Sequence, residues 1–577
     1  MAEVKNEQQD GHKILVELEA KFNAKPRCAV QGNGTQIHVL ATFADFLEQY
    51  PFPVVINAGI LKLADWFRKS NNVIKCHVYK VFKQASELHL AKVINIEETV
   101  RRIMPVLESN DPCARAITLR VLGYDPINPF CLWSCSILER LELATEREEL
   151  EAAIWAGDQI CSRSARFPSV IFSKIVTKLK DTDTTIDIKL RLVKIFRHMH
   201  RDIAMAREAK ETCLELLKQE HNCEPLVIVV LRTLTLLLSE ALIDRNQQID
   251  LLLSYIMNDR RERVQYSAFQ DLILLGKNDL MFDRLHMTSL LHAVTTMSAS
   301  TRLEQRALKC AHVLIWSHPR LITHLLYDRT SSDGEAFISS LKVCEEKLVR
   351  SIHSQGYTLV VACAQLLCSV VRIALIRKET ADEMDVDQTL ASDVFSLGNR
   401  VIDYIRLAED NLYITVPPRR QDIWTLRELL KVKSRICRLM SDEVRGDMFL
   451  EGYKLLATVN NELLDDYTSI LVSYLSSIYS QSLSSVDRFF DLLTNALQSR
   501  RERPKFFVNI VRLFLQTAKL SLTEREEVSD RLMLLLKEYG GWNEPRQLFT
   551  VNAWELYCLG KVAARYGWLK LLLQPAG

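Results

Sequence analysis

The chain repeats one short pattern, a polar turn followed by a helix with an apolar stripe, at intervals of 36 to 41 residues. Eight polar turns mark the repeats, anchored at Asn33, Asn72, Asp111, Arg147, Asp183, Asn222, Asp259 and Ser300. The mean interval is about 38 residues, which leaves room for two helices and their turns. A single helical hairpin cannot bury its own apolar face, so the repeat predicts hairpins stacked side by side.

The apolar residues that follow the anchors have helical spacing. Three sets share this spacing: Ile74, Val78, Val81, Phe82 and Ala85; Ile188, Leu192, Ile195, Phe196 and Met199; Val264, Ala268, Leu272 and Leu275. A second helix is expected ahead of most anchors, as in 54–69 and 96–107. Each repeat is therefore predicted to be a helix–turn–helix unit.

Glycine and proline are scarce in this chain. It has 17 glycines and 15 prolines among 577 residues, whereas a β-rich fold of this size would use both residues in dozens of tight turns. No glycine or proline lies between Pro168 and Pro225, so turns in that stretch must use Asp181, Asp183 and Asn222. The composition argues against sandwiches, barrels and propellers.

The clearest repeat unit runs from Ser109 to Gly123. Asp111 suits the N-cap, because its carboxylate can accept a hydrogen bond from a free amide, and Pro112 suits the first helical position. Gly123 suits a left-handed helix stop, as does Gly276 in a second unit of this format. The unit resembles a HEAT repeat, and the period lies just below that of HEAT and armadillo units. The predicted fold is all-α, an α-solenoid of HEAT- or armadillo-like hairpins.

The predicted organisation has four parts. Residues 1–31 form a polar N-terminal segment with a first helix, and residues 32–327 form the regular repeats. Residues 328–335 are expected to be a loop. Residues 336–577 form further helical repeats, interrupted by an acidic loop at about 378–392 that is rich in aspartate and glutamate.

Charge and cysteine content set further limits. The chain has 74 basic and 72 acidic residues, so it lacks the basic excess of a protein built mainly to grip nucleic acid. It has 14 cysteines but no Cys-x-x-Cys pair, which predicts free, mostly buried thiols in a reducing compartment.

The sequence predicts neither a signal peptide nor a membrane span. The polar N-terminus lacks the apolar stretch of a signal peptide. The apolar stretches 357–371 and 225–243 are too short or too interrupted to span a bilayer and are expected to be buried helices.

Several patterns resemble metal sites but fail on detail. His198-Met-His200-Arg-Asp202 lacks the further histidine that the metallo-β-lactamase motif needs, and helical positions two apart point about 200° from each other. These histidines are expected to lie at the surface or to pack between hairpins. Cys131 and Cys135 lack two further zinc ligands and are expected to be buried, as are Cys363 and Cys368.

Other motifs also fail or are missing. A calcium loop opening at Asp385 and Asp387 would need Gly at 390 and Glu at 396, where Leu390 and Ser396 stand. Gly32-Asn33-Gly34 is expected to be a turn, since no strand precedes it. The sequence holds no phosphate loop, zinc-protease motif or nucleophile elbow. We therefore predict no enzyme activity and no catalytic, cofactor-binding or metal residues.

Two basic runs leave alternatives open. They comprise Arg260, Arg261 and Arg263, and Arg500, Arg501, Arg503 and Lys505. Each run could act as a nuclear import signal or contact nucleic acid. Each also contains a glutamate and could equally be a solvent-exposed turn between two helices. Trp66, Trp316 and Trp424 are candidate partner contacts, since interfaces are enriched in aromatic residues, but each could equally be core.

Residues 50–72, 109–123 and 198–202 resemble the Integrator complex subunit 7 family. Weaker similarity covers 248–277 and 552–567. Residues 124–149 depart from the family, with Pro126 and Pro129, so a helix is expected to be missing or spliced differently there. The chain also ends at Gly577, whereas family members continue, which is expected of a truncated isoform or gene model.

This resemblance implies a non-catalytic scaffold subunit of the nuclear Integrator complex, without a cofactor, a small-molecule ligand or a membrane. Such a subunit supports small nuclear RNA 3′-end processing and attenuation of RNA polymerase II transcription, with a role in the DNA-damage response. Its implied partners are other Integrator subunits and, indirectly, RNA polymerase II and a phosphatase module, and its place is the nucleus, with a cytoplasmic pool left open. Two alternatives remain at this point: a cytosolic α-solenoid adaptor of the transport-receptor or vesicle-coat type, and an enzyme whose active site carries no motif.

Overall fold

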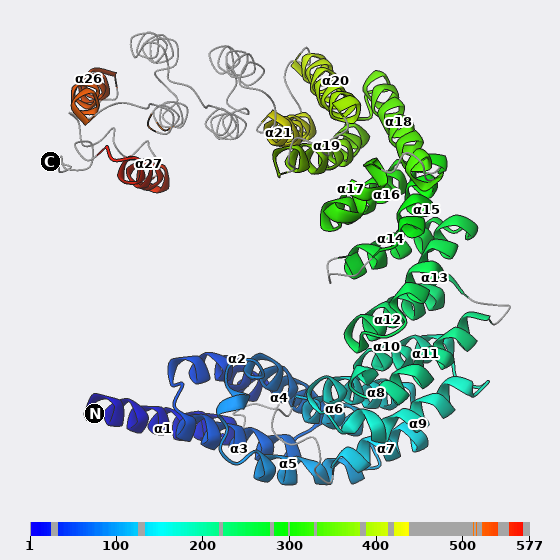
Figure 1. The fold of residues 1–577 in the computed structure, drawn as a ribbon. Coiled ribbons are helices and arrows are strands. Elements are labelled where there is room, and N and C mark those ends of the chain that lie inside the picture. Colours follow the sequence, from blue (N-terminus) through cyan, green and yellow to red (C-terminus); the bar gives the residue numbers. More distant parts are fainter. Residues whose placement is uncertain are drawn as a thin grey trace. The chain divides into compact units, whose positions relative to one another are not determined.

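The computed structural model contains helices and turns, and no strand occurs in the part of the chain that it describes (Figure 1). The described residues are 2–24, 33–124, 133–218, 223–276, 282–297, 300–327, 332–380, 388–413, 420–437, 512, 515, 522–539 and 553–568. The chain divides into two compact units, Met1–Asp271 and Leu272–Gly577, and the boundary falls inside one helix.

The first unit holds the regular repeats. Its helices are α1 (Ala2–Asn23), α2 (Gly34–Gln49), α3 (Pro53–Lys69), α4 (Asn72–Ala85), η2 (Leu90–Lys92), α5 (Ile96–Ile103), η3 (Met104–Glu108), α6 (Pro112–Leu122), α7 (Trp133–Leu143), α8 (Arg147–Arg163), α9 (Phe167–Lys180), α10 (Ile186–Ile195), η4 (Phe196–Arg201), α11 (Ile203–Lys218), α12 (Glu224–Ala241) and α13 (Arg245–Asn258), and the boundary lies in α14 (Glu262–Gly276). The η elements are 3₁₀ helices. The segment 124–149, where we expected a helix to be missing or spliced differently, contains α7, while Pro126 and Pro129 lie outside the described residues.

The second unit has longer helices. Those that the structure describes are α15 (Arg284–Thr296), α16 (Thr301–Ser317), α17 (Pro319–Tyr327), α18 (Ser332–His353), α19 (Tyr357–Thr380), α20 (Gln388–Tyr413), α21 (Arg420–Cys437), α26 (Leu522–Tyr539) and α27 (Ala553–Arg565).

Two layers of helices confirm the predicted solenoid of hairpins. In the first unit α2 packs on α4, α4 on α6, α6 on α8, α8 on α10 and α10 on α12, so one helix of each hairpin builds a continuous layer. The second layer includes the pairs α1–α3, α3–α5 and α7–α9. The second unit follows the same rule, with α16 on α19, α19 on α21, α15 on α18 and α18 on α20.

Seven of the eight polar anchors lie at the first residue of a helix or within three residues before it, as predicted, and the eighth, Asn222, lies outside the described residues. The Asp111 carboxylate accepts a hydrogen bond of 2.9 Å from the Cys113 amide, and Ser300 caps α16 in the same manner. At the second anchor the cap is Asn71 rather than Asn72. Each cap satisfies a backbone amide that has no partner within its helix.

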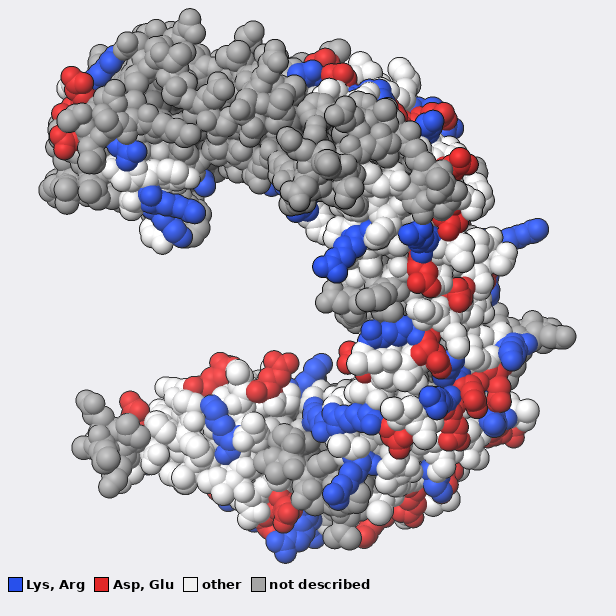
Figure 2. All heavy atoms as spheres, viewed as in Figure 1, with Lys and Arg blue, Asp and Glu red and all other residues white. Residues whose placement is uncertain are grey.

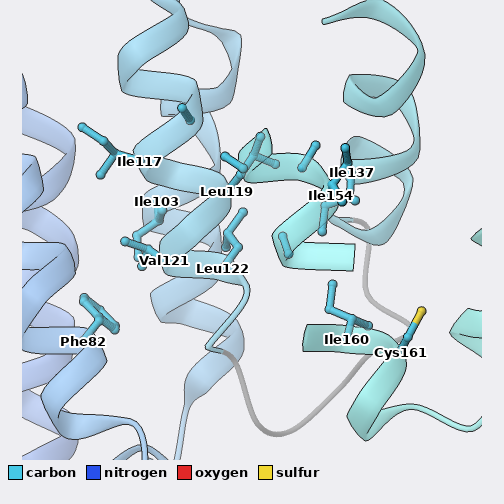
Figure 3. Packing of buried hydrophobic residues seen from close by; sticks show 14 of the residues in the cluster. Phe82, Ile103, Ile117, Leu119, Val121, Leu122, Ile137, Ile154, Ile160 and Cys161 are labelled. Carbon is cyan, nitrogen blue, oxygen red and sulfur yellow. The ribbon is translucent and has the colours of Figure 1, made fainter. Parts of the chain in front are cut away.

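The predicted apolar stripes face the space between the layers. All residues of the three stripes are buried. Figure 3 shows Phe82 of α4, Ile117 of α6 and Ile154 of α8 within one continuous core. Helices of this length are only marginally stable on their own in water, so most of the folding stability comes from burial of these stripes between the layers.

Two predicted helices end in 3₁₀ turns instead of continuing as α-helix. The helix expected over 96–107 stops at Ile103, because Pro105 has no amide to donate, and η3 follows. The stripe from Ile188 to Met199 is shared between α10 and η4. A 3₁₀ ending bonds the last carbonyls of a helix over a shorter span, so the chain can turn sooner.

Gly123 does not adopt the left-handed stop that we expected. Its φ is −64°, in the right-handed region, and Gly276 likewise has no positive φ. Gly123 is needed for close approach instead, because a Cβ added there would lie 2.5 Å from Cζ3 of Trp155 on α8. A Cβ on Gly276 would meet Leu314 in the same way.

Replacing Gly123 by alanine is expected to lower the free energy of unfolding by about 1–3 kcal/mol, the cost of overpacking against a rigid indole ring. Gly34→Ala is the matched control, since no atom lies within 4 Å of a Cβ there. Its stability should be unchanged or rise by up to about 1 kcal/mol. Urea unfolding monitored by circular dichroism measures both, and equal effects would contradict the close-approach explanation.

The described residues of both predicted loops are helical. Ser332–Glu335 belong to the first turn of α18, where Asp333 and Glu335 favour the positive end of the helix dipole. Residues 378–380 end α19, where Lys378 and Glu379 are good helix formers, and residues 388–392 begin α20, where Gln388, Leu390 and Ala391 are. Residues 328–331 and 381–387 lie outside the described part, and with them Asp385 and Asp387.

Both apolar stretches lie in buried helices, as expected, but the first belongs to a longer apolar stretch than we predicted. Residues Tyr357–Leu375 of α19 are, among the described residues, the one stretch long and apolar enough to cross a membrane, and 78% of that stretch is buried within the fold. The core side of α12 is also buried, from Leu226 to Ser239. Burial of this extent is typical of a core helix in a stacked array.

Candidate interaction surfaces

Polar contacts join successive repeats of the first unit at the repeat spacing. They connect residues 37 to 39 positions apart: Asn95 N to Asn57 Oδ1 (3.1 Å), Asn72 Nδ2 to Asp111 Oδ2 (2.5 Å), Arg102 Nη1 to Asp65 Oδ2 (2.7 Å), Arg197 Nη2 to Asp158 Oδ2 (2.8 Å) and Arg232 Nη1 to Asp271 Oδ1 (2.6 Å). Asn72 and Asp111 are consecutive anchors of the sequence pattern. The contacts fix the register of one hairpin on the next.

A buried carboxylate binds three helices of the first unit together. Glu149 of α8 is 0% exposed, and both its oxygens accept hydrogen bonds from Arg115 of α6, at 2.8 and 2.6 Å. Nη1 of Arg140 on α7 lies 3.7 Å from Oε1. Arg115 also donates to the Ser109 carbonyl at 2.7 Å. A charge buried this deeply needs such partners, so we call Glu149, Arg115 and Arg140 the Glu149 clamp.

The histidine motif serves packing between repeats. Nε2 of His198 lies 3.0 Å from Oδ1 of Asp158 on α8, and Nδ1 of His200 lies 3.0 Å from the Arg197 carbonyl. Asp202 accepts from the Ala204 amide at the start of α11. The prediction of a packing role is confirmed for His198. No group of three His, Cys, Asp or Glu side chains suited to a metal ion occurs within the described ranges.

Of the cysteines that we expected to be buried, the two in the second unit are buried and one in the first unit is not. Cys363 and Cys368 are buried in α19, and burial raises the pKa of the Cys368 thiol to about 12. Cys135 is exposed, contrary to our expectation. It lies two positions before the buried Ile137 and therefore on the opposite side of α7. Cys131 lies outside the described residues.

The basic run at 260–263 lies at the turn between α13 and α14 and is largely neutralised. Nη2 of Arg261 lies 2.5 Å from Asp259, whose pKa this hydrogen bond lowers, and Arg263 lies 3.5 Å from Glu224. Arg260 is exposed. Figure 2 shows basic side chains interspersed with acidic ones on the face in view. The run at Arg500–Lys505 lies outside the described part.

The three candidate tryptophans differ in exposure. Trp66 is core, at 5% exposed, and its ring stacks on Phe22 with centroids 4.1 Å apart. Trp316 and Trp424 are 39% and 41% exposed. Two of the three candidates therefore remain available for contact with another molecule.

Asp271 of α14 is a buried carboxylate with a single partner among the described residues. Its Oδ1 accepts a hydrogen bond from Arg232, while Oδ2 is buried without a hydrogen bond. Burial raises the pKa of Asp271 to about 6, against the lowering effect of Arg232. Desolvation thus outweighs the ion pair at this position.

Asp271 should make the first unit less stable as pH rises from about 4 to 6. In that window the unfolded carboxyl, with a pKa of about 3.9, has lost its proton while the folded one retains it, so a higher pH favours unfolding; above about 6 the effect is complete. Asp271→Asn should remove this dependence, and the variant should gain about 2–3 kcal/mol over the parent between pH 4 and pH 7. Urea unfolding at both pH values measures the gain, and a constant difference between the two proteins would contradict the prediction.

Comparison with known proteins identifies relatives over most of the chain. Residues 30–568 match the family described as Integrator complex subunit 7, N-terminal. Integrator complex subunit 7 of Homo sapiens is 40% identical over 244 residues, covering 42% of this chain and 25% of the relative. The Drosophila melanogaster protein of the same name is 24% identical over 601 residues, covering 97% of this chain and 54% of the relative. The chain thus matches about half or less of these relatives' length.

Solved structures with a similar arrangement of helices include karyopherins. Yeast importin-β, Kap95p, has 10% sequence identity and a TM-score of 0.43, covering 98% of this chain and 80% of that one. Kap121p bound to RanGTP has 10% identity and a TM-score of 0.48, covering 96% and 56%. The sequence match, which spans 539 of the 577 residues, is what assigns the family: the chain belongs to the Integrator complex subunit 7 family.

Proposed function

We propose that this chain is a non-catalytic scaffold subunit of the nuclear Integrator complex. Two observations support the proposal. Residues 30–568 match the family, and the chain folds into a two-layer array of hairpins whose successive repeats are joined by polar contacts. The buried ionisable groups Glu149 and Asp271 are engaged between helices, which is a structural role. In this role the chain contributes surface and geometry, while chemistry belongs to other subunits.

The mechanism of such a scaffold is geometric. An array that holds two proteins at fixed sites raises the effective concentration of one at the other without a new contact between them. The Glu149 clamp and the Arg232–Asp271 pair resist sliding of hairpins past each other, since sliding would leave their buried carboxylates unpaired. Exposed aromatic residues such as Trp424 are candidates for the contacts themselves.

The proposed setting follows from the family. The chain would support 3′-end processing of small nuclear RNA and attenuation of RNA polymerase II transcription, and take part in the DNA-damage response. Its partners would be other Integrator subunits and, through them, RNA polymerase II and a phosphatase module, in the nucleus. A cytosolic transport or coat adaptor is not favoured, because the relatives of this chain carry the Integrator name.

Affinity purification of the tagged chain from nuclear extract, with mass spectrometry of what co-purifies, tests the proposal. Integrator subunits should be recovered above a tag-only control. A longer member of the family, purified in parallel, shows which partners depend on the part that this chain does not match. Recovery of vesicle-coat or import factors in place of Integrator subunits would overturn the proposed function.

A further inference from the structure

An exposed tryptophan in the second unit lies against two arginines from neighbouring helices. Trp316 is near the end of α16, and Cζ of Arg372 on α19 lies 3.7 Å from the centre of its ring. Cζ of Arg435 on α21 lies 5.7 Å from the same centre. Because α19 packs on both α16 and α21, three helices bring these side chains together. We call Trp316, Arg372 and Arg435 the Trp316 cluster.

Among the residues that the structure describes, no carboxylate pairs with either of these guanidinium groups. Within the described ranges neither Arg372 nor Arg435 forms an ion pair, although Arg372 is half-buried and Arg435 is exposed. Arg115 and Arg197, by contrast, each lie within 3 Å of a carboxylate oxygen. The Trp316 cluster is therefore an unbalanced positive site on an ordered surface.

His312 does not add to this charge, but it helps to hold the cluster in place. Burial, together with the nearby Arg435, lowers the pKa of His312 to about 4, so the ring is neutral at pH 7. Its Nδ1 lies 3.1 Å from Oγ of Ser369 on α19, and its ring centre lies 6.2 Å from that of Trp316. The contact ties α16 to α19 one helical turn before Trp316.

The stacked geometry selects the chemistry of a partner. The ring contacts the flat face of the guanidinium group, whereas the N–H groups point outward from its edge. These N–H groups can therefore donate two parallel hydrogen bonds to one carboxylate. A nucleic-acid base would need an open ring face, and Arg372 already occupies one at 3.7 Å. The near-neutral charge of the chain, +2, also lacks the basic excess of a nucleic-acid binder.

We propose that the Trp316 cluster binds an acidic peptide segment of a partner protein, with Arg372 and Arg435 each taking a carboxylate. The ring of Trp316 holds Arg372 in position and adds apolar contact to the bound segment. This assignment goes beyond the scaffold role, because it names one local site and the charge of its ligand.

Fluorescence anisotropy with the full chain tests the site. The probes are a fluorescein-labelled peptide of alternating glutamate and serine and a labelled oligouridine. The double substitution Arg372→Gln/Arg435→Gln should weaken peptide binding by at least about tenfold, as expected when two charge-assisted contacts are lost. Arg260→Gln, which removes an exposed arginine in the first unit, should leave the affinity within about twofold.

Three outcomes would overturn the proposal: no binding of the peptide, equal binding by the parent and the double variant, or a loss confined to oligouridine, which would assign the site to RNA. Circular dichroism shows whether the double variant is folded. If it is not, Arg372→Lys/Arg435→Lys keeps the charge but removes the planar fork, and an affinity for the peptide equal to that of the parent would then contradict the bidentate contact.

Discussion

Replacing Glu149 by alanine is expected to lower the free energy of unfolding of the first unit by about 3–5 kcal/mol, the cost of removing one partner from a buried ion pair. Glu149 is 0% exposed and Arg115 only 14%, so the substitution leaves a guanidinium with little access to water. The loss should be concentrated in α6, α7 and α8, which the Glu149 clamp joins. Urea unfolding gives the magnitude, and hydrogen–deuterium exchange shows which helices lose protection.

Asp187→Ala is the matched control for the Glu149 clamp. Asp187 also bridges two repeats, since its carboxylate lies 3.0 Å from Arg147, but both side chains are about 60% exposed. Exposed ion pairs contribute about 0.2–1 kcal/mol, so this variant should remain close to the parent. If Glu149→Ala cost no more than Asp187→Ala, the clamp would not be holding the repeats together.

Replacing Trp66 by alanine is expected to cost about 3–5 kcal/mol, the range for removing a buried indole from a packed core. Trp66 of α3 stacks on Phe22 of α1 and meets Phe43 of α2 edge-on, with ring centres 5.8 Å apart. The substitution therefore opens a cavity among the first three helices. Thermal or urea unfolding of the purified chain measures the loss.

Trp424→Ala is the control for Trp66→Ala, because Trp424 lies at the surface and Trp66 in the core. Trp424 is 41% exposed, so its removal takes less surface out of the core and should cost about 1–2 kcal/mol, clearly less than Trp66→Ala. If Trp424 contacts a partner, the same substitution should weaken co-purification of that partner while the fold is retained. A stability loss at Trp424 equal to that at Trp66 would show that both rings are core and would remove Trp424 as a contact candidate.

The regular repeats could be predicted from sequence because their contacts are periodic. The pattern of about 38 residues reappears in the structure as polar contacts 37 to 39 positions apart, and the anchors Asp111 and Ser300 cap helices as expected. Stripes such as Ile74 to Ala85 are buried because helical spacing alone decides which side chains share a face. Local patterns were sufficient here.

The second unit could not be predicted in the same detail. Its helices α18, α19 and α20 have 22, 24 and 26 residues, so the period is lost although the stacking persists. Arg400 and Glu345 now meet across 55 positions and Gln365 and Glu428 across 63. No fixed interval in the sequence marks these pairs.

Buried charges and clusters also escaped the sequence analysis, for a physical reason. Glu149 stands in the run Arg147-Glu-Glu-Leu-Glu, which has the composition of an exposed helix face, and its partner Arg115 is 34 positions away. The members of the Trp316 cluster belong to three separate helices. Only the packing of those helices brings such residues together.

A scaffold of the proposed kind must hold several proteins at once. Native mass spectrometry of the assembly purified through a tag on the chain tests this requirement directly. We expect single particles that contain the chain together with two or more different Integrator subunits. Recovery of the chain alone, or only of pairs in which each partner excludes the others, would contradict a scaffold.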